Sequence, residues 1–270
     1  MSLYSVKQGL RVIATGFCFI VFGVGATLIS VYFLLVAMLP LKKLRKQSIV
    51  RRTISKASLF YLWVMASLGL LTIHFDVELA QKSSGKLIVA NHPTLLDAIF
   101  FLSHMDDLCC IVKESLWQNP FTLIMVTMAG YIPNDSETLI DEVSAKLRSG
   151  ENILIFPEGT RNTYDDQLDF KRGAANIAIA ANCQLLPLLI KCTPRTLQKH
   201  AKWHDVPASS PHFSFQVFPA ITIADCIDTS RPRTVQYRHL TEYLREYYRP
   251  HLSSKSEAGE KSKAENTVNN

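Results

Sequence analysis

The chain has 270 residues, 48% of them hydrophobic, and carries a net charge of +6, which accommodates one globular domain and a membrane-anchoring region. The positive charge predicts an anionic partner, and because no arginine-rich arm or aromatic RNA-binding motif is present, a lipid membrane is favoured and nucleic acid is not expected. None of the six cysteines lies in a C-x-x-C pair or at zinc-ligand spacing, which argues against a metal or redox site.

The first third of the chain contains one long apolar run. No charged residue occurs from Val12 to Leu41, and a membrane-spanning helix needs about 20 apolar residues. A cleaved signal peptide is the alternative, but its apolar region would be only about 7–15 residues long, and the residues that follow here are basic. We therefore predict a retained N-terminal transmembrane helix.

A basic cluster without any acidic residue follows this run. Only Lys7 and Arg11 precede the run, so the distribution of positive charge places the loop after the helix in the cytoplasm. The cluster would also attract anionic lipid headgroups, at about 1 kcal/mol per basic side chain. Its members are Lys42, Lys43, Arg45, Lys46, Arg51, Arg52 and Lys56.

A second apolar stretch covers residues 59–75 and is short for a membrane span. It is rich in aromatic side chains, among them Phe60, Tyr61 and Trp63, which is typical of the membrane interface. We predict an interfacial helix here. If this stretch crossed the membrane instead, the rest of the chain would lie on the other face.

From residue 76 onwards, short strands alternate with helices, which predicts an α/β domain with a mixed, largely parallel sheet flanked by helices. Residues 1–57 are predicted to form the membrane anchor and a basic loop, residues 58–252 the globular domain, and the polar residues 253–270 a disordered tail. The predicted strands cover residues 77–79, 87–90, 108–112, 152–156, 185–190 and 213–223. The predicted helices cover residues 94–103, 117–128, 137–148, 174–181 and 233–248.

The strand over residues 87–90 leads into Asn91-His92-Pro93-Thr94-Leu95-Leu96-Asp97. A histidine at the carboxyl end of a buried strand lies at the crevice of an α/β sheet. Asp97 would fall about one turn into the next helix, where its carboxylate could hold one nitrogen of His92 and leave the other as a base. The alternative is an exposed histidine and an aspartate that merely suits the helix dipole.

The strand over residues 152–156 also ends in polar residues, namely Pro157-Glu158-Gly159-Thr160-Arg161. Glu158 and Arg161 beside a core strand are expected to pair or to bind a ligand. Gly159 allows close approach of a ligand to the backbone, and the guanidinium of Arg161 suits phosphate or carboxylate. The alternative is a surface turn with a Glu–Arg pair.

Together, the Asn91-His92-x-x-x-x-Asp97 motif and the later Phe156–Arg161 motif resemble the glycerolipid acyltransferase family. The resemblance covers residues 59–223. Lys113 matches a lysine that helps to bind phosphate in the family, but the family's arginine beyond Gly130 is absent, and Pro133, Asn134 and Asp135 follow Ile132 instead. Further resemblance lies in Phe170-Lys171-Arg172-Gly173 and in Leu186-Pro187-Leu188.

The resemblance implies a membrane-bound O-acyltransferase of lipid biosynthesis, acting on the cytoplasmic face without a metal or redox cofactor. The donor would be acyl-CoA or acyl-carrier protein, and the default acceptor the hydroxyl of a lysophospholipid, 1-acylglycerol-3-phosphate. His92 would act as general base and Asp97 would orient it. The implied substrate-binding residues are Asn91, Lys113, Glu158, Gly159, Thr160, Arg161, Lys171 and Arg172.

Three alternatives stay open at this point. The missing arginine, together with the acidic Asp135, favours a different acceptor, such as a lyso-aminolipid or a glycolipid precursor. A non-catalytic membrane scaffold would not need His92, Asp97, Glu158 and Arg161 together. A lipid hydrolase would need a nucleophile elbow of the form G-x-S-x-G, which the sequence lacks.

Overall fold

The computed structural model describes residues 3–75, 83–161 and 168–252. A sheet of seven strands forms its centre, in the order β1-β7-β6-β2-β5-β3-β4. Neighbouring strands are parallel except for β6 and β7. The strands are β1 (Thr72–Phe75), β2 (Leu87–Ala90), β3 (Cys109–Val112), β4 (Ile132–Pro133), β5 (Ile153–Ile155), β6 (Leu185–Thr193) and β7 (His212–Val217). The predicted mixed, largely parallel α/β sheet is therefore confirmed.

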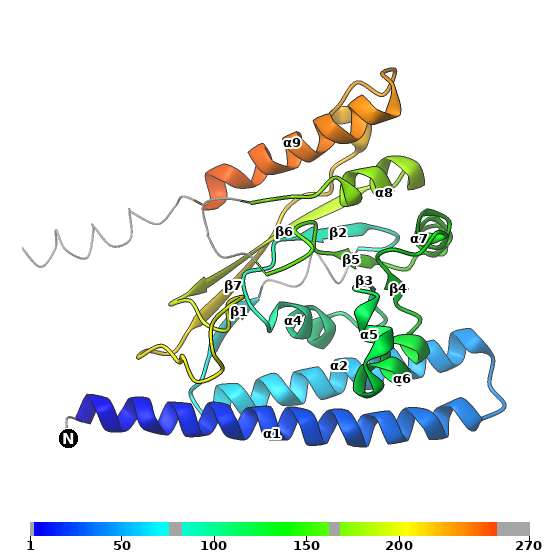
Figure 1. Cartoon of the computed structure of the whole chain (residues 1–270). Helices are drawn as coiled ribbons and strands as arrows, with labels where there is room; N and C mark the ends of the chain where they lie inside the picture. The colour runs from blue at the N-terminus through cyan, green and yellow to red at the C-terminus, as the bar shows by residue number, and fades with distance from the viewer. Residues whose placement is uncertain (1–2, 76–82, 162–167, 253–270) are drawn as a thin grey trace, which may run out of the picture.

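Helices cover both faces of this sheet (Figure 1). On one face lie α8 (Gly173–Ala181) and α9 (Arg233–Leu252), and on the other lie α4 (Asp97–His104), α2 (Lys43–Ser67) and, outermost, α1 (Leu3–Met38). The remaining helices are α5 (Ser115–Gln118), α6 (Pro120–Ala129), α7 (Leu139–Arg148) and the short η1 (Ile223–Asp225). Because β2 and β5 are enclosed on both faces, all of their residues are buried and apolar.

The N-terminal apolar helix predicted from sequence is present as α1, and residues Val6–Met38 are long and apolar enough to cross a membrane. However, α1 runs along the base of the domain beside α2 and does not project from it (Figure 1). Its residues Cys18, Phe33 and Val36 are buried against the rest of the protein. Arg11 fixes its first half by donating hydrogen bonds to the carbonyl oxygens of Pro207 (3.1 Å) and Gly69 (2.9 Å).

The basic loop predicted within residues 1–57 is wrong, because residues 43–67 form the single helix α2. No proline or glycine interrupts this segment, so a helix continues from its charged half into its apolar half. The boundary predicted at residue 57 therefore falls within a helix. The interfacial helix predicted over residues 59–75 ends at Ser67, and Gly69, with φ of +67°, precedes β1.

Other boundaries differ by local causes. The helix predicted over residues 117–128 is split into α5 and α6, because Pro120 begins a new helix. The strand predicted over residues 213–223 ends at Val217. The helix predicted from residue 94 begins at Asp97. The strand predicted over residues 77–79 and the tail predicted over residues 253–270 lie outside the described residues.

Candidate active site

The two sequence motifs meet at one edge of the sheet. Strands β2 and β5 are parallel neighbours, with Val89 opposite Ile155, so the segments that follow their carboxyl ends lie side by side. Crevices at such edges are the usual ligand sites of α/β sheets. The sequence therefore places its two polar motifs together, as the α/β alternation predicts.

His92 and Asp97 form a hydrogen-bonded pair in this crevice. The distance between His92 Nδ1 and Asp97 Oδ2 is 2.7 Å. The imidazole stacks on the ring of Phe156, with centroids 4.3 Å apart and the planes inclined by 20°. The side chain of His92 is 20% exposed whereas that of Asp97 is fully buried. The histidine thus has one nitrogen engaged with the carboxylate while part of its ring faces solvent.

Asp97 is held by the backbone and side chain of Thr94 as well. The Thr94 amide donates to Oδ2 (2.7 Å) and the Thr94 hydroxyl donates to Oδ1 (2.6 Å). The prediction that Asp97 lies one turn into the helix is wrong, because it is the first residue of α4. Its carboxylate instead accepts hydrogen bonds from Thr94 in the turn before the helix, and these bonds hold it against the imidazole.

Burial raises the pKa of the Asp97 carboxyl, and hydrogen bonds from His92 and Thr94 oppose this shift. Since the carboxylate accepts three hydrogen bonds and touches no water, it favours the imidazole tautomer that carries its proton on Nδ1. Nε2 is then left with its lone pair, as a general base requires.

Glu158 supports His92 from the other motif. Its Oε1 accepts a hydrogen bond from the His92 backbone amide at 2.9 Å, and the residue is only 4% exposed. Burial raises the pKa of Glu158 to about 7, and Asp97 and Asp169 add to the shift, while the hydrogen bond from His92 opposes it. Glu158, which was predicted to bind substrate, thus makes a contact within the protein that fixes the position of His92.

Arg161 lies next to Glu158, but its guanidinium is partly engaged. Nη1 donates to the carbonyl oxygens of Leu197 (3.0 Å) and Gln198 (3.1 Å). The Leu197 oxygen also accepts from the Leu95 amide at 3.2 Å. Arg161 therefore joins the segment after β6 to the crevice, a role that sequence reasoning did not foresee. Gly159 occupies the turn with φ of +65°, which a residue with a side chain rarely adopts.

Asn91, predicted to bind substrate, is committed to the fold instead. Its Nδ2 donates to the Ile190 carbonyl oxygen (2.9 Å), and its Oδ1 accepts from the Ile190 amide (2.7 Å). Because both ends of a buried amide are satisfied within the protein, we correct this assignment. Asn91 joins the end of β2 to β6 and so holds the residue that precedes His92.

The remaining predicted residues are more exposed. Lys113 is exposed and follows β3, at the same edge of the sheet as His92. Thr160 is half-buried beside Arg161. Lys171 is exposed and paired with Asp169, and its backbone amide donates to the Pro157 carbonyl oxygen at 2.8 Å. Arg172 is exposed directly before α8. All four stand on segments that follow β3, β5 or the second motif.

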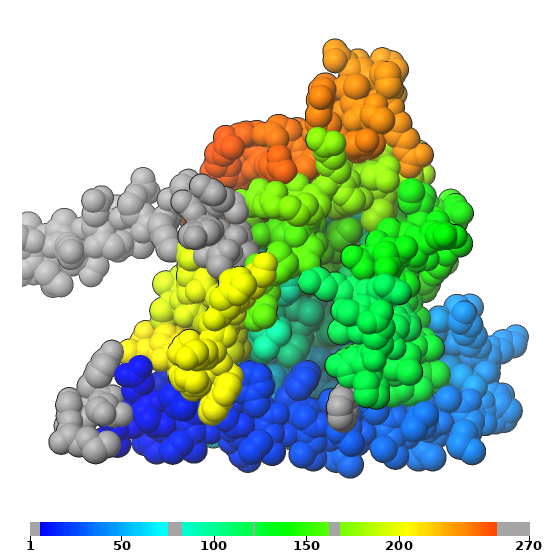
Figure 2. All heavy atoms as spheres, viewed as in Figure 1, coloured from blue at the N-terminus to red at the C-terminus, as the bar shows by residue number. Residues whose placement is uncertain are grey.

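A hollow opens at this edge in the surface of the molecule (Figure 2). The segment around residue 200 (yellow) lies on one side of it and α5 and α6 (green) on the other, with the teal region around the start of α4 at its floor. Helix α1 (blue) runs below. Sequence reasoning missed Phe156 and Thr94 as members of this site, since an aromatic residue at a strand end and a threonine before a helix carry no signal of their own.

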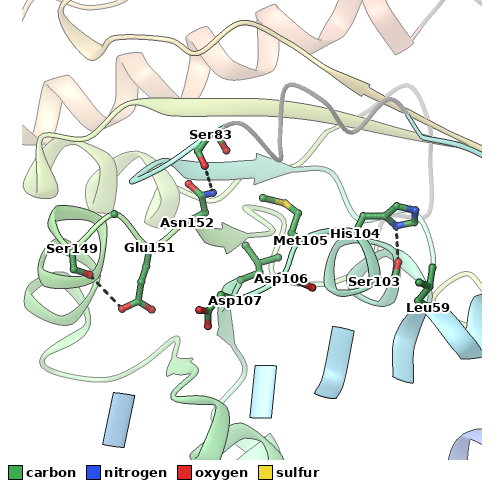
Figure 3. A pocket seen from close by; sticks show the side chains of 12 residues that line it. Leu59, Ser83, Ser103, His104, Met105, Asp106, Asp107, Ser149, Glu151 and Asn152 are labelled. Atoms are coloured by element: carbon green, nitrogen blue, oxygen red, sulfur yellow. Dashed lines mark hydrogen bonds between the residues drawn. The ribbon is translucent and has the colours of Figure 1, made fainter. Parts of the chain in front are cut away.

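A depression of about 730 Å³ lies elsewhere. It is lined by residues that precede strands, including Ser83 before β2 and Asn152 before β5, and by the acidic Asp106, Asp107 and Glu151 (Figure 3). It is therefore at the amino ends of the strands, opposite His92. Within the described part of the chain, no group of three histidine, cysteine, aspartate or glutamate residues is arranged to hold a metal ion.

Comparisons with known proteins match the part of the chain that contains both motifs. The family model described as acyltransferase matches residues 70–191, which include both motifs. A 1-acyl-sn-glycerol-3-phosphate acyltransferase from Helicobacter pylori is 34% identical over 116 residues, or 40% of this chain and 49% of the relative. The beta form of that enzyme from Homo sapiens is 28% identical over 122 residues, or 42% of this chain and 44% of the relative. The chain thus spans about half the length of these relatives.

The fold has a counterpart of known structure. The crystal structure of the 1-acyl-sn-glycerophosphate (LPA) acyltransferase PlsC from Thermotoga maritima superposes with a TM-score of 0.68. It covers 93% of this chain and 96% of that chain, at 18% sequence identity. These findings confirm the family resemblance predicted from the two motifs.

Proposed function

Because residues 70–191 match the acyltransferase family model, we propose that this protein is a membrane-bound O-acyltransferase. It would transfer a fatty acyl group from acyl-CoA or acyl-carrier protein to the hydroxyl of a lysophospholipid, with 1-acylglycerol-3-phosphate as the first candidate. The observation that carries this proposal is the pair of His92 and Asp97 at 2.7 Å, at the hollow formed by the ends of β2 and β5.

The chemistry of this pair leads to direct transfer. His92 Nε2 takes the proton of the acceptor hydroxyl while the hydroxyl oxygen attacks the thioester carbonyl. Asp97 stabilises the imidazolium that forms. As the carbonyl reforms, the carbon–sulfur bond breaks, and the imidazolium returns its proton to the thiolate. Because the Asn91–Asp97 motif contains no serine or cysteine, a covalent acyl-enzyme is not required.

Two contacts support a positioning role for residues of the second motif. Glu158 holds the backbone of His92, and Arg161 holds the segment at Leu197 against the crevice. The other nitrogens of Arg161, with Lys113 and Arg172, would meet the anionic headgroup of the acceptor. No metal or redox cofactor enters this scheme.

One observation favours the second candidate, an acceptor with an amine in its headgroup. Lys113 is followed by Glu114, whose pKa is raised by a hydrogen bond with Asp135 and by its charge. Two carboxyl groups therefore stand beside the lysine that would bind phosphate. A phosphate monoester would be repelled there, whereas a lyso-aminolipid would find both charges matched.

The surface of α1 supports attachment to a lipid membrane. Large apolar side chains are exposed along its length, including Leu10 (61%), Ile13 (70%), Leu28 (66%) and Leu35 (59%). Helix α1 contacts the rest of the protein from Arg11 to Val36, so it cannot cross a bilayer without drawing the domain into it. We infer that α1 lies in the membrane surface, on the cytoplasmic face, in place of the crossing predicted from sequence.

A segment from the opposite end of the sequence extends this surface. Trp203 is 51% exposed and contacts α1 beside Gly16, with its ring edge-on to Phe19 at 6.4 Å. Exposed Lys202 and His204 flank it. An amphipathic ring with basic neighbours suits the headgroup level of a membrane. The lyso-lipid acceptor would then enter the hollow from the membrane that α1 contacts.

The acceptor assay tests this proposal. Purified full-length protein in detergent is given radiolabelled acyl-CoA with either 1-acylglycerol-3-phosphate or a lyso-aminolipid, and His92→Ala is the blank. Labelled diacyl product from the first acceptor supports the default assignment, and product from the second alone supports the alternative. Failure of folded protein with either acceptor and with both acyl-CoA and acyl-carrier protein would contradict the proposal.

A further inference from the structure

The hydrogen-bond ladder between β2 and β6 is regular where the strands begin. The Leu87 amide donates to the Gln184 carbonyl oxygen at 3.0 Å, and Val89 and Ala90 lie opposite Pro187 and Leu188. If the pattern of a parallel sheet continued from this bond, the Leu188 amide would donate to the Val89 carbonyl oxygen. This pair of backbone groups, here called a rung of the ladder, is the last one within β2 before the first motif.

A side chain from the far end of the chain occupies this rung. Tyr248, on α9, accepts a hydrogen bond from the Leu188 amide (2.9 Å) through its hydroxyl, which donates to the Val89 carbonyl oxygen (2.6 Å). The side chain is completely buried, and its ring packs edge-on to Phe170 at 5.3 Å. A phenol oxygen is thus inserted between two strands.

A second side chain links these strands nearer the hollow. Ile190 exchanges hydrogen bonds through both of its backbone groups with the side-chain amide of Asn91. Tyr248 and Asn91 therefore both link β2 to β6, which the register pairs as far as Ala90 and Leu188. His92 is the residue that follows these links, so they fix the backbone from which the imidazole projects.

We propose that the Tyr248 hydroxyl is a positioning group for His92: by bridging Val89 and Leu188 it sets the separation of β2 and β6, and with it the backbone from which His92 projects. The catalytic consequence rests on the function proposed above. Burial raises the pKa of Tyr248, and the charge of nearby Glu158 adds to this, so the hydroxyl stays protonated and able to donate. Helix α9 thereby becomes part of the catalytic framework, although it lies on the face of the sheet opposite α4 (Figure 1).

The variant Tyr248→Phe removes only the bridging oxygen and keeps the ring that packs on Phe170. The Leu188 amide and the Val89 carbonyl oxygen then lose the hydroxyl that bridges them, so the backbone before His92 is held less firmly and can move. A displacement of about 1 Å at a reacting group can lower the rate about 100-fold. We therefore expect kcat to fall about 10- to 100-fold, with KM for both substrates unchanged.

Two matched variants separate positioning from stability. Tyr131→Phe also removes a buried phenol oxygen, one that has no hydrogen-bond partner among the described residues, and should keep full activity. Leu240→Ala weakens the packing of α9 at a fully buried position, so it should lower the melting temperature without lowering kcat of the folded protein. The account is overturned if Tyr248→Phe keeps the kcat of Tyr131→Phe, or if it loses activity only as its folded fraction falls.

A second readout does not depend on acyl transfer. Diethyl pyrocarbonate modifies accessible imidazole, and peptide mass spectrometry gives the rate at His92 relative to exposed His204. We expect this ratio to change several-fold in Tyr248→Phe and to stay constant in Tyr131→Phe. An unchanged ratio contradicts the positioning role even in an inactive preparation, whereas a changed ratio without any transfer by wild type would count against the proposed function alone.

Discussion

Two clusters of buried charged side chains lie at opposite ends of the same parallel strands. At the amino ends, Arg51 donates to the Ala129 carbonyl oxygen (2.7 Å) and to Glu151 (2.6 Å), and lies 3.6 Å from Asp107. At the carboxyl ends, Asp97 and Glu158 both hold His92. The first cluster borders the depression at the amino ends of the strands, yet its charges neutralise one another and tie α2 to the sheet.

The two clusters differ in the pKa of their buried glutamate and in the exposure of the side chain beside it. Burial alone would raise the pKa of Glu151, but Arg51 and Lys146 hold it below its usual range, as in a structural ion pair. Burial raises the pKa of Glu158 to about 7, and the histidine beside it is 20% exposed. The raised pKa of buried Glu158 beside a partly exposed histidine marks the carboxyl-end cluster as the candidate site.

The largest expected effect is on activity at the carboxyl-end cluster. Asp97→Asn replaces the carboxylate by an amide that can donate to His92 and so favours the wrong tautomer. We expect kcat to fall about 10²- to 10⁴-fold, with little change in KM, measured by steady-state transfer from labelled acyl-CoA. Turnover by folded Asp97→Asn close to that of wild type would contradict the role of the Asp97 carboxylate in setting the tautomer of His92.

The next effect is on stability at the amino-end cluster. Arg51→Ala removes the buried guanidinium and leaves the half-buried Glu151 paired with Lys146 alone, and we expect a loss of about 1.5–3 kcal/mol in the free energy of unfolding. Denaturant titration followed by circular dichroism measures this. Arg52→Ala, at the exposed neighbouring position of α2, is the control and should change stability little. A drop in kcat of folded Arg51→Ala would show that this cluster also serves catalysis.

The pH dependence of stability sharpens the contrast further. The folded pKa of Glu158, about 7, exceeds its unfolded value of 4.5, so its ionisation costs stability as pH rises between these values. We expect this to remove about 2–3 kcal/mol from wild type on going from pH 4.5 to pH 8. Glu158→Gln should lack that loss, which melting temperatures at both pH values would reveal. Parallel pH profiles of the two proteins would refute the shift.

The smallest effect concerns the membrane surface beside the hollow. Trp203→Ala removes an exposed ring from the surface that α1 begins, and we expect affinity for anionic vesicles to fall by about 1–2 kcal/mol. Vesicle co-sedimentation measures this, and kcat in detergent, which should not change, is the control. Unaltered vesicle binding would show that the segment around Trp203 does not contact the membrane.

Local sequence patterns were enough to predict much of the fold and the central pair of the site. The alternation of apolar strands and amphipathic helices predicted the sheet, and the motif around His92 predicted its pair with Asp97, since these residues are only five positions apart. Helix α2 was not foreseen, because its first half reads as a basic loop and its second as an interfacial helix. The absence of proline and glycine allows one helix, and packing of α2 against α4, α1 and α6 holds its two halves in place.

The supports of the site depend on contacts between distant positions. Arg161 meets Leu197 36 positions away, Asn91 meets Ile190 99 positions away and Tyr248 meets Val89 159 positions away. Neither partner in such a pair carries a local signal, because an arginine, an asparagine or a tyrosine has many possible partners. Asn91 was therefore assigned to substrate, and Tyr248 was read only as part of a terminal helix.

The most direct test of the account is the rate of acyl transfer by His92→Ala at a folded concentration equal to that of wild type, established by circular dichroism and vesicle binding. The account predicts that wild type forms labelled product from acyl-CoA and a lysophospholipid, while His92→Ala forms none above background. Transfer by folded His92→Ala at a rate near that of wild type would contradict the assignment of His92 as the catalytic base.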